Sequence, residues 1–151
     1  ASLIASCCAV GAATTGSSEE TIEKMRLFGE KVGMAFQIKD DLFDYGEDVV
    51  GKPVGIDIKE KKMTLPLIYA LQNASWVDRK KIIYKIRNKS ENKGTINEII
   101  DFVKKSGGLE YAQKIMNNYY QEALALLENF PESPFKNSLA TLVTYTIERK
   151  K

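Results

Sequence analysis

The 151 residues are enough for one domain with a sizeable core, and a hydrophobic content of 44% argues against a disordered chain. The formal net charge of +2 gives no electrostatic case for nucleic-acid binding, and no apolar run reaches the roughly 18–20 residues that span a membrane. The absence of histidine excludes His-ligated zinc and any nucleophile that depends on a His base.

The first predicted helix covers residues 2–13 and is rich in small and apolar side chains. Small residues let two helices approach closely, so we expect this helix to be buried. Cys7 and Cys8 are adjacent and too few for a disulfide framework, which favours a reduced, cytoplasmic setting. The chain lacks an initiator methionine and the basic region of a signal peptide, so we expect it to begin inside something longer or to be processed.

A long second helix is predicted after a short turn around Gly16. Ser17 and Glu20 have the spacing of a capping box at its start. Gly29 lies on its apolar face and would let a neighbouring helix come close. That face is a stripe at helical spacing, made by Ile22, Met25, Val32 and Phe36.

Further helices follow to the end of the chain. Their expected starts or boundaries are marked by Thr64 with Pro66, Ser75, Thr95, Gly107-Gly108 and Ser133. The last helix is expected to end near Glu148, with basic residues 149–151 suited to its C-terminal dipole. Because no strand alternation of useful length and no repeat interrupts this pattern, the sequence predicts an all-α fold with one domain over residues 1–151.

Acidic residues gather near the end of the long helix. At about 100° per residue, Gln37, Asp40, Asp41 and Asp44 fall within one arc roughly 100° wide. Three carboxylates on one face repel each other, and a divalent cation would offset that repulsion. Oxygen ligands without His or Cys favour a hard ion such as Mg²⁺. The alternative is a solvated acidic face, against which the apolar neighbours such as Phe36 argue.

The glycine-rich loop that follows brings lysines close behind the carboxylates. Gly46, Gly51, Pro53 and Gly55 cannot continue a helix well. Acidic ligands beside lysines suit a magnesium–diphosphate complex, in which the metal bridges carboxylate to phosphate. For Lys59 and Lys61, which lie further along, an exposed lysine-rich loop is the preferred interpretation.

These motifs carry a family resemblance. Residues 33–44, GMAFQIKDDLFD, resemble the second aspartate-rich motif of the trans-type isoprenyl diphosphate synthases. The segments GKPVGID (51–57) and KMTLP (62–66) resemble those that follow it in that family. The resemblance implies the C-terminal portion of an all-helical isoprenoid synthase fold. It also implies Mg²⁺-dependent joining of an allylic diphosphate to isopentenyl diphosphate, and a homodimer formed through helices.

The resemblance assigns the metal to the three aspartates. Asp40 would be the principal Mg²⁺ ligand, Asp44 would support it directly or through water, and Asp41 would complete the motif. Asp57 would order the loop, by pairing with a lysine.

It assigns the substrate to four other residues. Lys52 and Lys62 would contact the allylic diphosphate. Gln37 would point its side-chain oxygen towards the reacting carbons, and Phe36 would line the substrate cavity.

The chain also departs from the family pattern. It contains neither the first aspartate-rich motif nor the basic residues that hold isopentenyl diphosphate, so we expect no synthase activity from these 151 residues alone. Product length is usually set near the missing motif and cannot be read here. The alternatives are a non-catalytic partner subunit on the same helical scaffold, another class I terpenoid enzyme such as a terpene cyclase, and a generic helical interaction module.

Overall fold

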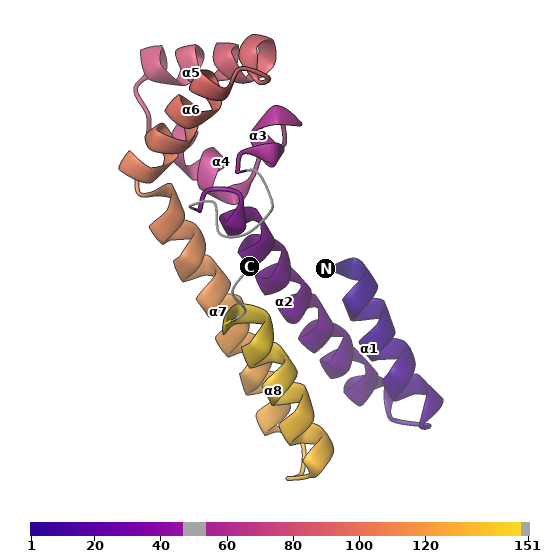
Figure 1. Ribbon diagram of the computed structural model, residues 1–151. Coiled ribbons are helices and arrows are strands. Elements are labelled where there is room, and N and C mark those ends of the chain that lie inside the picture. Colours follow the sequence, from indigo (N-terminus) through magenta and orange to yellow (C-terminus); the bar gives the residue numbers. More distant parts are fainter. Residues whose placement is uncertain (47–53, 149–151) are drawn as a thin grey trace. The chain divides into compact units, whose positions relative to one another are not determined.

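A computed structural model describes residues 1–46 and 54–148, and within these ranges the chain forms helices and no strand (Figure 1). The predicted all-α class is therefore confirmed. The helices are α1 (Ser2–Thr14), α2 (Glu19–Phe43), α3 (Ile56–Lys59), α4 (Leu65–Gln72), α5 (Trp76–Lys89), α6 (Lys93–Lys105), α7 (Gly108–Glu128) and α8 (Pro134–Glu148).

The chain divides into two compact units. Residues 1–39 with 115–150 form the first unit, and residues 40–114 form the second. The first holds α1, most of α2, the later part of α7, and α8. The second holds the end of α2, the four helices α3 to α6, and the start of α7.

In the first unit, α1 and the early part of α2 lie side by side as a hairpin (Figure 1). A Cβ atom at Gly29 would come within 2.6 Å of the Ile4 carbonyl oxygen, and one at Gly33 within 2.5 Å of Ala1 Cα. Real Cβ atoms do not approach other atoms this closely, so both glycines are needed for the contact. The predicted close approach of a helix at Gly29 is confirmed.

The prediction that the first helix is buried is wrong for α1 within the described residues. Ala5 is the buried residue of α1, whereas Leu3 and Val10 are largely exposed. The apolar core of the unit lies instead between α2, α7 and α8, where Phe28, Leu127 and Val143 are buried. Small side chains let α1 approach α2, but they offer little apolar surface to bury on its other faces.

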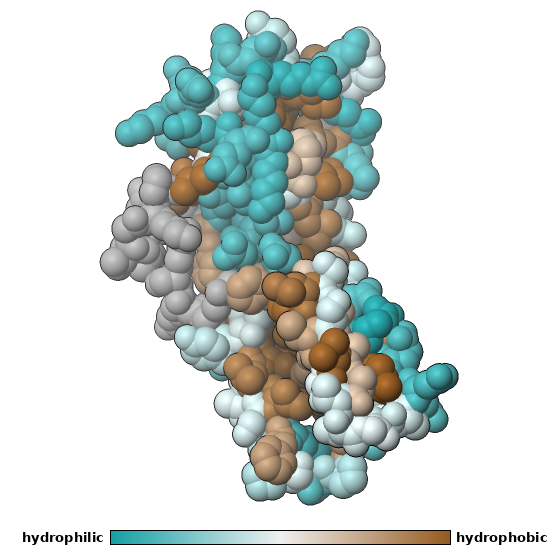
Figure 2. Space-filling model, turned by 90° about the vertical axis from the view of Figure 1, so that its right-hand side faces the viewer, coloured by the Kyte–Doolittle hydropathy of each residue, from teal (hydrophilic) through white to brown (hydrophobic). Residues whose placement is uncertain are grey.

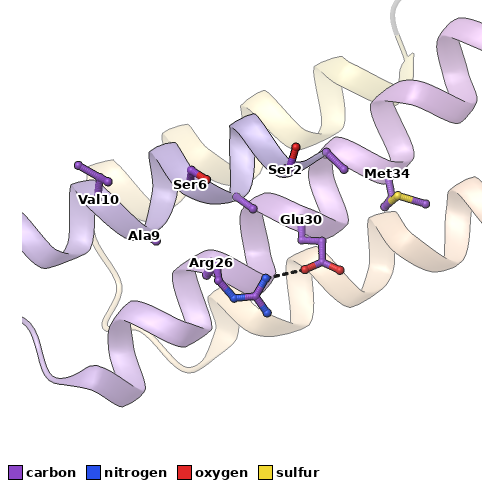
Figure 3. A pocket seen from close by; sticks show the side chains of 9 residues that line it. Ser2, Ser6, Ala9, Val10, Arg26, Glu30 and Met34 are labelled. Carbon is purple, nitrogen blue, oxygen red and sulfur yellow. Dashed lines mark hydrogen bonds and ion pairs between the residues drawn. The ribbon is translucent and has the colours of Figure 1, made fainter.

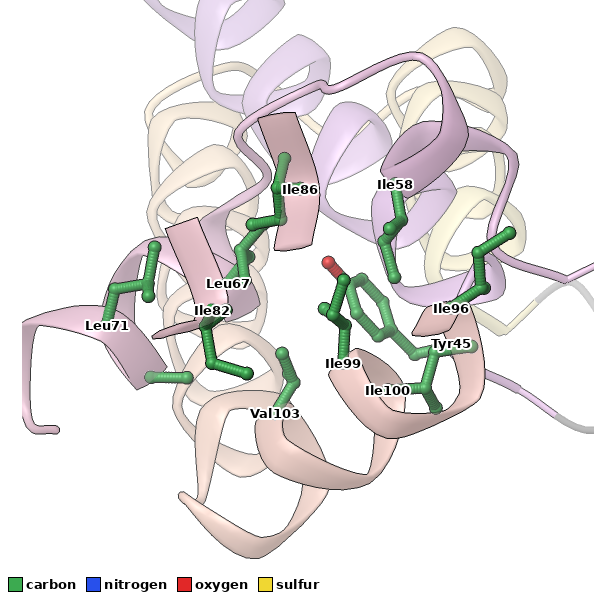
Figure 4. Packing of buried hydrophobic residues seen from close by; sticks show 11 residues of the cluster. Tyr45, Ile58, Leu67, Leu71, Ile82, Ile86, Ile96, Ile99, Ile100 and Val103 are labelled. Carbon is green, nitrogen blue, oxygen red and sulfur yellow. The ribbon is translucent and has the colours of Figure 1, made fainter. Parts of the chain in front are cut away.

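The second unit is held by an isoleucine-rich core between α3, α4, α5 and α6 (Figure 4). Ile58, Leu67, Ile99 and Val103 are completely buried there. The buried Tyr45 hydroxyl lies 2.5 Å from Thr64 Oγ1, so its polar end has a partner inside the core. This bond ties the segment after α2 to the segment before α4.

The predicted helix starts were correct where a short polar side chain precedes the helix directly. Ser75 Oγ accepts a hydrogen bond from the Asp78 amide at 3.1 Å, and Ser133 Oγ accepts one from the Lys136 amide at 3.1 Å. At α6 the cap is Asn92, whose Oδ1 accepts from the amide of Thr95, so the predicted Thr95 cap is wrong.

The start of α2 and the presence of α3 also differ from the predicted elements. The long helix is capped at Ser18, whose Oγ accepts from the Thr21 amide, rather than at Ser17. The four-residue helix α3 was not predicted, because it is too short to show a hydrophobic period. Residues 149–151 lie outside the described ranges, and no helix within those ranges has the length and apolarity to cross a bilayer.

Candidate functional site

The aspartates lie where α2 ends in the second unit. Asp40 and Asp41 belong to the last turns of the helix, and Asp44 follows its final residue, Phe43. They differ in environment, because Asp40 is exposed, Asp41 is half-buried and Asp44 is 7% exposed. The three carboxylates of this motif therefore differ in how far they are exposed to solvent.

Asp44 caps the short helix α3. Its Oδ1 accepts a hydrogen bond from the Ile56 amide at 2.9 Å, and its Oδ2 accepts one from the Asp57 amide at 3.0 Å. A carboxylate at a helix N-terminus satisfies amides that have no partner within the helix. The backbone of Asp44 takes part as well, because its carbonyl oxygen accepts from the Gly55 amide at 3.0 Å. Asp44 therefore anchors the far end of the loop to the end of α2.

Gly55 makes this cap sterically possible. Its φ of +82° lies in the left-handed region, and a Cβ atom there would be 2.2 Å from Ile96 Cγ2. Glycine is thus required at this position both for the backbone conformation and for the packing against α6.

Lys62 closes the other side of the site. Its Nζ lies 2.8 Å from Asp41 Oδ1 and 3.3 Å from Asp57 Oδ2. The Lys62 amide also donates to the Asp57 carbonyl oxygen at 2.8 Å. The prediction that Asp57 pairs with a lysine is confirmed. The structure thereby brings together Asp41, Asp44, Asp57 and Lys62, which are up to 21 residues apart in the chain.

Burial and charge act against each other at this pair. Burial raises the pKa of Asp41, and the adjacent Lys62 ammonium opposes that rise without cancelling it. The hydrogen bond to Asp41 raises the pKa of Lys62, so the lysine stays cationic at neutral pH. A carboxylate that is partly desolvated and a fixed ammonium beside it are suited to binding a second anion that brings its own cation.

The described residues contain no group of three or more carboxylates, cysteines or histidines close enough to hold a metal ion by themselves. The oxygen donors at the end of α2 are of the type that Mg²⁺ prefers, and such ions often take only one or two carboxylates together with phosphate oxygens. The donor set therefore fits a metal that arrives with a phosphorylated ligand.

The other predicted site residues are Phe36, Gln37 and Lys52. Phe36 and Gln37 belong to the part of α2 in the first unit, where Phe36 is half-buried and Gln37 is exposed. Lys52 lies outside the described residues. Sequence reasoning missed the buried bond between Tyr45 and Thr64, because a tyrosine and a threonine 19 residues apart give no local signal.

A separate hollow lies along α1 and α2 of the first unit (Figure 3). Small residues such as Ser2, Ser6 and Ala9 line it from α1. Arg26 and Glu30 face it from α2 and form an ion pair at 2.7 Å. The lining is mostly small and apolar, and the carboxylate that faces the hollow, Glu30, is already paired with Arg26.

A family model and individual relatives both match the sequence of this chain. The family model described as polyprenyl synthetase matches residues 1–103. Heptaprenyl diphosphate synthase component 2 of Bacillus subtilis is 34% identical over 98% of this chain and 42% of its own length.

Solved structures agree with the sequence comparison. The crystal structure of geranylgeranyl pyrophosphate synthase from Bacteroides thetaiotaomicron has a TM-score of 0.89 and 37% identity, over 97% of this chain and 49% of that one. That of geranylgeranyl pyrophosphate synthase from Corynebacterium glutamicum, complexed with calcium and isoprenyl diphosphate, has a TM-score of 0.79 and 32% identity, over 97% and 46%. The chain therefore spans less than half the length of each of these relatives.

Proposed function

Because the chain belongs to the polyprenyl synthetase family, we propose that it is part of a Mg²⁺-dependent prenyltransferase. The reaction is the condensation of an allylic diphosphate with isopentenyl diphosphate. The chemical demand of this reaction is to stabilise the charge that develops on the departing diphosphate. Relatives named as diphosphate synthases, one of them solved with calcium and isoprenyl diphosphate, support this substrate class.

One observation supports the proposal above the others. The Lys62 ammonium is held 2.8 Å from Asp41 and 3.3 Å from Asp57, at the end of a helix that presents further carboxylates. Bound allylic diphosphate would offer Lys62 phosphate oxygens in place of its carboxylate partner, and Asp41 would then be among the residues that hold Mg²⁺. The existing ion pair thus holds both groups ready for a bound metal and diphosphate.

The residues divide the work by their burial. Asp40, exposed at the end of α2, is the proposed principal ligand of Mg²⁺, with Asp41 beside it. Asp44 has both carboxylate oxygens bonded to α3 amides, so its support of the site is to fix α3, the helix that carries Asp57. Bound Mg²⁺ would supply positive charge to the leaving diphosphate.

Three assignments rest on the family resemblance. Lys52 is proposed to bind the diphosphate with Lys62. Gln37 is proposed to point its side-chain oxygen towards the reacting allylic carbons, and Phe36 to line the substrate cavity. We further propose that the 151 residues are inactive alone, that the working protein is a homodimer and that it is cytoplasmic. Formation of prenyl product by the purified chain, from an allylic diphosphate and isopentenyl diphosphate with Mg²⁺, would contradict the proposed inactivity.

The test of the site is a calorimetric titration with a non-ionising allylic thiodiphosphate, in the presence and absence of Mg²⁺. We expect magnesium-dependent binding that is lost in Asp40→Ala and weakened in Lys62→Met. Asp101→Ala removes an exposed carboxylate from α6 of the same unit and serves as the matched control. Equal binding with and without Mg²⁺, or equal loss in the control, would refute the assignment.

A second candidate function is a non-catalytic partner subunit built on the same scaffold. The observation that favours it is the relative in Bacillus subtilis, whose name describes it as one component of a synthase. Failure of this chain to bind the thiodiphosphate, together with stable association with a second polypeptide that restores synthase activity, would support this alternative.

A further inference from the structure

The outward face of α5 combines aromatic and basic side chains. At about 100° per residue, Trp76, Val77, Lys80, Tyr84 and Arg87 fall within one arc roughly 100° wide. The buried residues of α5, Ile82 and Ile86, lie on the opposite side, in the core of the second unit. The outward arc is therefore a surface that folding of the unit leaves uncovered.

The exposed fractions are unusual for residues of this kind. Trp76 is 69% exposed, Val77 66% and Tyr84 58%. Scattered apolar residues on a surface need no explanation, but these three lie on one face of one short helix, with Lys80 on the turn between them, and together form a patch.

Charge is concentrated on the same helix. Between Trp76 and Lys89, α5 carries six basic residues and one acidic residue, for a net charge of +5 in a protein of net charge +2. Among these cations, Arg79 donates to the backbone carbonyls of Leu71 and Gln72 at the end of α4, and Lys85 pairs with Glu98. Figure 2 shows hydrophilic side chains gathered over the part of the molecule that holds α5 and α6.

The basic surface continues past the end of α5. Lys59 and Lys61, at the end of α3 and just after it, share a polar hollow with Arg87 and Lys89. Glu91 is the one acidic residue among those that line this hollow. Arg87 belongs both to the hollow and to the aromatic arc, so the two are one continuous surface.

We propose that this surface, formed by α5 and the adjacent hollow, docks the protein onto an anionic lipid membrane. Tryptophan and tyrosine favour the membrane interface because one end of each ring is apolar and the other is polar. Lysine and arginine are attracted to the negative potential of anionic headgroups. The helix lies on the bilayer and does not enter it, because its apolar side is already used in the protein core.

The geometry at Trp76 favours lipid over nucleic acid. Lys80 Nζ lies 3.8 Å from the centre of the Trp76 ring, so one face of the indole is already covered by a cation and is closed to base stacking. The exposed Val77 beside it adds aliphatic surface, which suits acyl chains. This inference rests on α5 and the adjacent hollow and does not depend on the proposed reaction.

The sequence provides its own reporter, since Trp76 is the single tryptophan of the chain. The 151-residue protein is titrated with vesicles of phosphatidylcholine alone and with vesicles that also contain phosphatidylglycerol. We expect a blue shift of the emission and quenching by brominated lipid only with the anionic vesicles, both reversed at high salt. No spectral change, or an equal change with neutral vesicles, would overturn the proposal.

Paired charge reversals test whether α5 forms the surface that binds the vesicles. Lys80→Glu with Arg87→Glu should weaken binding to anionic vesicles, measured by co-sedimentation, by at least about thirtyfold. Lys104→Glu with Lys114→Glu makes the same charge change at exposed positions of α6 and α7 and should cost little. Equal losses in both pairs would refute the assignment to α5, as would a Trp76 response to single-stranded RNA but not to vesicles. Because the fluorescence arm uses the unmodified protein, it decides the question even where a variant fails to fold.

Discussion

Replacing Asp44 tests whether a residue of the acidic motif holds the loop together. In Asp44→Ala the amides of Ile56 and Asp57 lose the carboxylate that now accepts from them at 2.9 and 3.0 Å. Hydrogen bonds to a charged group contribute roughly 1.5–3 kcal/mol each, and loss of an N-cap costs roughly 0.5–2 kcal/mol. Removal of a buried charge recovers part of its desolvation penalty. We therefore expect the free energy of unfolding to fall by about 2–3 kcal/mol.

The assay is urea denaturation at neutral pH, followed by far-UV circular dichroism. Asp44→Asn should be intermediate, because its amide group keeps one acceptor but turns a donor towards the second backbone amide. Asp101→Ala, at an exposed site on α6, should change stability by less than about 0.5 kcal/mol. A loss below about 0.5 kcal/mol in Asp44→Ala would refute the idea that Asp44 anchors α3.

Three further predictions concern tight backbone positions and the lysine of the site. Gly55→Ala should destabilise the protein by about 2–4 kcal/mol, because it adds a steric clash to the strain of a left-handed backbone. Gly16 has a φ of +72° but open space around it, so Gly16→Ala should cost only about 1–2 kcal/mol in the same denaturation assay. Gly29→Ala should lower the melting temperature by forcing α1 away from α2. Gly11→Ala, within α1 and with nothing within 4 Å of the added Cβ atom, should raise it. The aspartate partner of Lys62 raises the pKa of this lysine. The ion pair therefore stabilises the fold fully below the ordinary lysine pKa, and this stabilisation is lost as the pH rises through the raised pKa. The free energy of unfolding should fall more steeply at alkaline pH in the parent protein than in Lys62→Met.

Each of these predictions has a contrary result. Equal destabilisation by the two alanines at left-handed positions would show that packing against α6 is unimportant. Equal melting temperatures for the two helical glycine variants would contradict the close approach of α1 and α2. Parallel alkaline unfolding curves would show that the lysine gains nothing from its partner.

The sequence by itself determined the features that depend on neighbouring residues. The period of apolar side chains predicted the helices, and polar side chains directly before α5 and α8 marked their starts, because capping acts over three or four residues. The motif at residues 33–44 also identified the family, since it is a continuous stretch of chain. Gly29 could be predicted as a helix–helix contact because a glycine on the apolar face of a helix leaves room for a second helix to approach closely.

Tertiary structure decided what depends on distant residues. Only the folded unit shows that the Asp44 carboxylate accepts hydrogen bonds from two α3 amides, which lie 12 and 13 residues further along the chain. The same holds for the ion pair between Lys62 and Asp41. Only packing shows that α1 buries little beyond Ala5, and that α5 turns its isoleucines inward and leaves Trp76 and Tyr84 outside. Local propensity sets where a helix begins and ends, but which of its faces meets a partner depends on the shape and chemistry of the segments that fold against it.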